Sequence, residues 1–135
     1  MSRSRLILSA VAALIVAVGL GFAWGASGRF TIQNALDEMQ QRLDLAEARG
    51  HILEARVSLY NVNFGDASRH FENAKPPLRR IRERYQQLGR NAAAGSIAAA
   101  LEQVEEGQRL AGKLDQAANS RANDALEAIR VASSQ

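Results

Sequence analysis

The chain has no cysteine, and its prolines, histidines and aromatic residues are few. Its 135 residues include two prolines, two histidines and only 5% aromatics, although 47% are hydrophobic. Without cysteine there can be no disulfide, thiolate metal site or cysteine nucleophile. Because much of the hydrophobic content is alanine, the composition favours slim, closely packed helices over a broad core with a deep pocket.

Signs of catalysis or of nucleic-acid binding are also missing. The serines have no adjacent histidine, and neither a G-x-S-x-G elbow nor a phosphate-binding loop occurs. The formal net charge of +3 is too small to indicate a nucleic-acid partner. The sequence therefore predicts a non-enzymatic protein without a cofactor.

One long uncharged run stands near the start of the sequence. Arg3 and Arg5 precede it, it extends over residues 6–28, and Arg29 closes it. As a helix it would be about 34 Å long, enough to cross a bilayer core. We expect residues 1–29 to form a retained membrane anchor, with a cleavable secretory signal as the alternative.

The charges around this run predict its orientation. Basic residues lie mainly before it, which places the N-terminus in the cytoplasm and residues 30–135 in the periplasm, with the anchor in a bacterial inner membrane. Small residues recur every fourth position and would let another transmembrane helix approach closely. They are Ser9, Ala13, Ala17, Gly21 and Gly25.

Residues 30–135 are predicted to be all-α, because good helix formers dominate and no strand-like alternation occurs. We expect an up-down helical hairpin bundle of three helices, or four if Asn119-Ser120 breaks the last one. The expected helices are about 31–61, 65–88, 96–118 and 121–132. Asn63 is a plausible N-cap, Gly89 a C-terminal stop, and Pro76-Pro77 a kink within one helix.

Two stretches have apolar or small residues spaced alternately four and three apart, which is typical of a coiled-coil seam. The first seam is Ile32, Leu36, Met39, Leu43, Ala46, Gly50, Leu53, Val57 and Tyr60. The second is Ala67, Phe71, Ala74, Leu78, Ile81, Tyr85 and Leu88. Later apolar positions are less regular, and Gly107 interrupts them.

In the segment Glu54 to Lys75, small and aromatic residues recur at Ala55, Leu59, Phe64, Ala67, Phe71 and Ala74, with the turn from Asn63 to Ala67 between the two arms. On these residues the segment resembles a single tetratricopeptide-repeat hairpin. It implies a tight helical hairpin. No second copy follows at a 34-residue period, so it does not imply a repeat protein.

The histidines, His51 and His70, fall on opposite arms of this hairpin. With the turn taken as residues 61–65, their heights differ by roughly 7 Å. We therefore expect no metal site, although Glu54 and Glu72 could supply carboxylates nearby.

Arginines cluster on the arm that returns toward the membrane, at Arg79, Arg80, Arg82, Arg84 and Arg90. They could contact anionic lipid phosphates or an acidic partner. The alternative is internal pairing with Glu102, Glu105 and Glu106. Three aromatics, Tyr60, Phe64 and Phe71, lie near the far end of the hairpin, either as a docking patch for a partner or as core.

These features favour a single-pass membrane protein that acts as a scaffold, assembly or accessory subunit of a bacterial envelope complex. We expect a protein partner or self-association through helix packing. The alternatives are a periplasmic sensory or ligand-binding bundle and a secreted helical protein released by signal cleavage.

Overall fold

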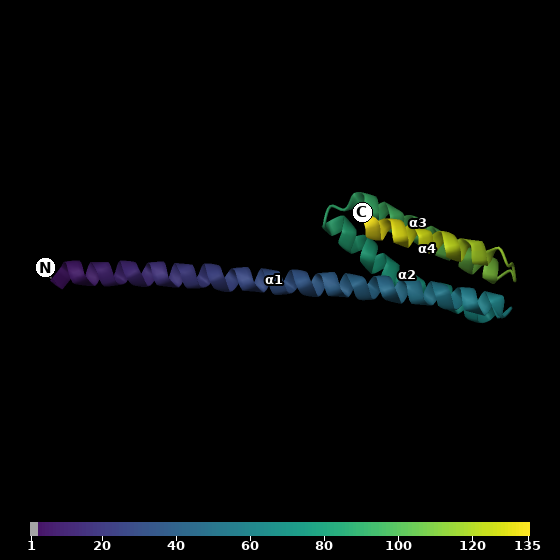
Figure 1. The fold of residues 1–135 in the computed structure, drawn as a ribbon, viewed down its shortest axis with the longest axis horizontal. Coiled ribbons are helices and arrows are strands. Elements are labelled where there is room, and N and C mark those ends of the chain that lie inside the picture. Colours follow the sequence, from purple (N-terminus) through teal and green to yellow (C-terminus); the bar gives the residue numbers. More distant parts are fainter. Residues whose placement is uncertain (1–2) are drawn as a thin grey trace. The chain divides into compact units, whose positions relative to one another are not determined.

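The computed structural model describes the backbone of residues 3–135 and the side-chain surroundings of residues 14–18 and 32–135. Four helices make up the described chain (Figure 1): α1 Arg3–Tyr60, α2 Phe64–Gln87, α3 Asn91–Ala111 and α4 Ala118–Ser134. The prediction of an all-α chain is confirmed.

The chain divides into two compact units, Met1–Met39 and Gln40–Gln135. Within the described residues, no helix combines the length and the apolar character needed to cross a bilayer. In the predicted stripe of small residues, Ala17 is the member whose surroundings are described, and it is exposed. The surroundings of Ser9, Ala13, Gly21 and Gly25 lie outside the described part of the chain.

The second unit is an up-down bundle. Helix α3 packs against both α2 and α4 (Figure 1). Residues 44 and 54 of α1 contact residues 80 and 70 of α2, so these helices run antiparallel. Arg49 and Arg56 of α1 likewise hydrogen-bond to Ser133 and Asn119 of α4. The C-terminal part of α1 is therefore the fourth member of the bundle.

The predicted N-cap and C-terminal stop of α2 both form. The Asn63 side chain accepts a hydrogen bond from the Asp66 amide, 3.1 Å away, and caps the start of α2. Gly89 follows α2 with a φ of +70°, a left-handed conformation that glycine adopts without strain. The helix continues through Pro76 and Pro77.

The later boundaries differ from the prediction. Helix α3 starts at Asn91 rather than Ser96, because the reversal at Gly89 lets the alanine-rich residues after it join the helix. The break before α4 lies between Ala111 and Ala118, not at Asn119-Ser120. Leu114, at φ 58°, leaves the right-handed helical region there.

The core of the bundle confirms most of the second seam. Its members from Ala67 to Tyr85 are fully buried, whereas Leu88 caps the helix end and is exposed. The first seam does not enter the core. Helix α1 instead contributes five other residues, namely Leu45, Ala48, Ile52, Ala55 and Leu59.

Gly107 has a structural role in this core rather than leaving a gap. It is buried in α3, and a Cβ atom added to it would lie 2.8 Å from Cζ of the buried Phe71 on α2. Since real Cβ atoms do not approach carbon so closely, the Phe71 ring requires glycine at this position.

We expect Gly107→Ala to lower the free energy of unfolding by about 1–3 kcal/mol, because overpacking against Phe71 outweighs the gain in helix propensity. Gly95→Ala is the matched control on the same helix, since nothing lies within 4 Å of its added Cβ. It should instead raise stability by about 0.5–1 kcal/mol. Urea unfolding followed by circular dichroism measures both, and equal effects would contradict the Phe71 contact.

Candidate functional site

Helix α1 exposes the apolar side chains of the first seam. Leu43, Val57 and Tyr60 are 58%, 59% and 68% exposed, and Leu53 is about half exposed. In the first unit, Ile32, Leu36 and Met39 are exposed as well. We call the members of this seam in the second unit the α1 stripe: Leu43, Ala46, Gly50, Leu53, Val57 and Tyr60.

The α1 stripe and the buried residues of α1 lie on opposite faces of one helix. At 100° per residue, their mean directions differ by roughly 150° around the helix axis. The buried face includes Ala48 and Ala55, which suit close contact with α2 and α4. Leu53 and Val57 remain on the outer face, where the described chain supplies nothing to cover them.

A buried carboxylate joins α1 to α2. Asp44 is only 1% exposed, and its Oδ1 accepts hydrogen bonds from Arg80 Nε and Nη2 at 3.1 and 2.9 Å. Arg84 Nη1 lies 3.4 Å from the other carboxylate oxygen. Arg80 also reaches Glu47 at 2.9 Å. The hydrogen bond to Asp44 is the main reason that the pKa of Arg80 is raised.

Two arginines of the predicted cluster belong to this network. Arg80 and Arg84 pair internally, but with Asp44 and Glu47 rather than with the glutamates of α3. Arg90 lies over the ring of Tyr85, with its Cζ 4.4 Å from the ring centroid. Such cation–π contact stabilises the end of α2.

The other two arginines differ from each other. Arg79 is exposed and helps to lower the pKa of Glu72, behind the larger effects of Lys75 and Gln108. Arg82 is half-buried, and its Nε is a buried nitrogen without a hydrogen-bond partner. Contact of these residues with lipid or an acidic partner stays a prediction.

The predicted aromatic docking patch is wrong for Phe71, which is fully buried beside Gly107 and cannot reach a partner. Phe64 is half-buried and packs against the core. Only Tyr60 is well exposed, and it belongs to the α1 stripe. Hydrogen bonds from Asn119 and then Arg56 lower the pKa of its hydroxyl.

The two histidines come together, contrary to the expected difference in height. Their rings are 6.3 Å apart, and both Nδ1 atoms lie near Glu54 Oε2. The turn between α1 and α2 has three residues, 61–63, rather than five, so His51 is ten residues before its first residue and His70 is seven after its last. The remaining offset of about 4.5 Å is within reach of side chains.

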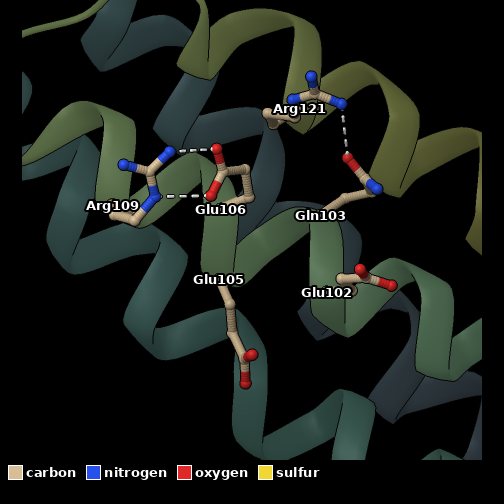
Figure 2. Close-up of a pocket in the computed structure, with 6 residues that line it drawn as sticks. All are labelled: Glu102, Gln103, Glu105, Glu106, Arg109 and Arg121. Carbon is tan, nitrogen blue, oxygen red and sulfur yellow. Dashed lines mark hydrogen bonds and ion pairs between the residues drawn. The ribbon is translucent and has the colours of Figure 1, made fainter.

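An open depression of about 460 Å³ lies over α3 and α4. Its lining is polar and consists of Glu102, Gln103, Glu105, Glu106, Arg109 and Arg121. Figure 2 shows Arg109 paired with Glu106 on its own helix and Arg121 bonded to Gln103, while the three carboxylates do not converge. Arg109 lowers the pKa of Glu106. This surface is solvated and offers no apolar wall for a small molecule.

Sequence reasoning missed Asp44 and the Glu54 cluster. Asp44 occurs one turn before Ala48 on the buried face, so helical spacing from the buried alanines could have found it. No protein-family model matches the chain, and comparisons with curated proteins and with solved structures found no match.

We expect Asp44→Ala to lower the free energy of unfolding by about 1–3 kcal/mol, because Arg80 and Arg84 lose their shared acceptor while Arg80 can still be hydrated. Glu47→Gln is the control, since it removes an exposed partner of the same arginine and should cost less than about 1 kcal/mol. Urea denaturation compares the two. If both variants match the unmodified chain, Asp44 does not hold α1 to α2.

Proposed function

We propose that this chain is a non-enzymatic, single-pass membrane scaffold that assembles through the exposed apolar face of α1. Residues 6–28 would anchor it in a bacterial inner membrane, with the N-terminus cytoplasmic and the bundle periplasmic. It would serve as an assembly or accessory subunit of an envelope complex. The observation that carries the proposal is the α1 stripe, an apolar face with seam spacing that the bundle leaves exposed.

The occupant that fits this face best is a second copy of the same chain. Residues spaced four and three apart form a seam that meets an identical seam in a two-stranded coiled coil. Upstream, Ile32, Leu36 and Met39 continue the spacing in the sequence. Ala46 and Gly50 are small and let two helix backbones approach closely. A stripe opposite the bundle face also leaves α2 and α4 in place when two copies pair.

The charges that flank the stripe are complementary between copies. Arg42, Arg49 and Arg56 follow one edge at seven-residue intervals, and Glu47 and Glu54 follow the other. In a parallel coiled coil, a residue on the first edge lies near the residue five positions later on the other edge of the second helix. Arg42 would then face Glu47 of the partner subunit, and Arg49 would face Glu54 of the partner subunit.

The same charges disfavour the antiparallel arrangement. Antiparallel pairing would bring the arginine edge of one helix against the arginine edge of the other, and glutamate against glutamate. Like charges in such positions are destabilising. A parallel pair also agrees with the proposed anchor, because two copies in one membrane start from the same side.

The absence of native cysteine makes a clean cross-linking test available. We expect full-length Leu43→Cys and Val57→Cys, purified in mild detergent and oxidised, each to form a disulfide dimer. In a parallel pair each position faces its own counterpart, although the two positions are about 21 Å apart along the helix. Ala98→Cys, an exposed position on α3, is the control and should stay monomeric.

Cross-linking only in a mixture of the two stripe variants would indicate antiparallel pairing and would contradict the parallel arrangement. Sedimentation equilibrium gives a second measurement. Leu53→Glu should convert a dimer to a monomer without loss of helix content, because Leu53 contributes little to the bundle core. A chain that is monomeric at micromolar concentration, with no cross-link at either stripe position, would overturn self-assembly.

A further inference from the structure

His51, Glu54 and His70 form a compact set of three donor atoms between α1 and α2. Glu54 Oε2 lies 3.3 Å from His51 Nδ1 and 3.0 Å from His70 Nδ1. One donor atom from each residue lies within 4.8 Å of the others. Two of these residues come from α1, one turn apart, and the third comes from α2 across the hairpin.

We propose that these three residues bind a zinc-class divalent cation that links α1 to α2. When zinc is coordinated tetrahedrally with bonds of 2.0–2.1 Å, neighbouring donor atoms are about 3.4 Å apart. The two distances to Glu54 Oε2 are close to this value. The two histidine nitrogens lie within 4.8 Å of each other, so side-chain rotations that bring them to about 3.4 Å would complete the spacing without moving either helix.

The His70 ring supplies a second, independent observation. Its Nδ1 atom is buried and has no hydrogen-bond partner, because the Glu54 oxygen lies near it in distance but not in hydrogen-bond geometry. A buried ring nitrogen normally has a donor or acceptor partner. Coordination of a cation by this nitrogen would satisfy it.

The site is accessible from solvent. The side chains of His51 and His70 are 27% and 23% exposed, and that of Glu54 is 58% exposed. The imidazoles are therefore mostly covered by the hairpin, while the more exposed carboxylate can rotate about its own side-chain bonds and uncover their nitrogens. A hydrated cation can enter without opening the core.

The donor chemistry selects the class of metal. Two imidazole nitrogens and one carboxylate oxygen suit Zn²⁺ and neighbouring transition metals, whereas Ca²⁺ and Mg²⁺ prefer sets of oxygen ligands. The three protein donors would leave the fourth position to water. Because the cluster lies on the helical surface and not in a cavity, we assign the cation a linking role and not a catalytic one.

Such a link would stabilise the folded bundle. The donors converge only when α1 and α2 are paired, so a cation that binds them favours the folded chain by mass action. The short turn at residues 61–63 already joins the helices at their ends. The cation would hold them together further from this turn.

Isothermal titration of the full-length chain in mild detergent with Zn²⁺ tests the proposal. We expect one ion per chain and a higher melting temperature in its presence. His51→Gln and His70→Gln should each weaken binding by about tenfold or more, since even the loss of an outer-shell partner typically weakens metal binding 10–100-fold. Both side chains are partly exposed, so the variants should remain folded, which circular dichroism checks.

The matched controls separate this site from adventitious binding. Glu102→Gln removes an exposed carboxylate of α3 that does not belong to the cluster, and it should bind zinc like the unmodified chain. The Co²⁺ complex should show the visible absorption of tetrahedral cobalt, and this band should vanish in the double variant His51→Gln/His70→Gln. Equal Zn²⁺ binding by the double variant and the unmodified chain, or no Zn²⁺ binding by the latter, would overturn the proposal.

Discussion

The structure depends on how α1 distributes two apolar faces around one helix. One face combines two alanines with leucine and isoleucine side chains and packs against α2 and α4, while the other retains Leu43, Leu53 and Val57 in solvent. A helix can bury a single stripe against its own bundle, because the opposite side turns away from it. The outer stripe is thus apolar surface that stays exposed when a single chain folds.

Close packing of small residues determines which face turns inward. Alanine contributes Ala48 and Ala55 from α1, Ala67 and Ala74 from α2 and a large share of α3 and α4 to the buried core. Leucine and isoleucine side chains such as Ile52, Leu78 and Ile97 fill the remaining space together with the rings of Phe71 and Tyr85. The Phe71 ring occupies the space above Gly107, so a glycine in one helix and a phenylalanine in the next are matched in shape.

The regular features of the fold could be predicted from the sequence because local rules determine them. The second seam, the Asn63 cap and the Gly89 stop each depend on residues close in the chain. The inward face of α1 could not be predicted in the same way, since a count of large apolar residues favours the outer stripe and discounts alanine. Which face is buried depends on the shape of α2 and α4, which lie far away in the sequence.

The candidate sites were also only partly predictable from the sequence. The meeting of His51 and His70 depends on a turn that is two residues shorter than expected, and a small change in turn length alters which residues face each other. Arg80 and Arg84 have acidic partners, as electrostatics requires of partly buried charge, but the sequence offered several acidic residues and the structure selects Asp44.

Helix α2 depends on tertiary packing more than the other helices do, because it alone contains prolines, and these two are adjacent. Pro76 and Pro77 have no amide hydrogen, so the carbonyl groups of Glu72 and Asn73 cannot receive the regular helical hydrogen bonds. Burial of Pro77 and Leu78 against the bundle offsets that loss. Helix α2 is thus helical at its centre because of tertiary packing, and a peptide of its sequence alone would lose helix there first.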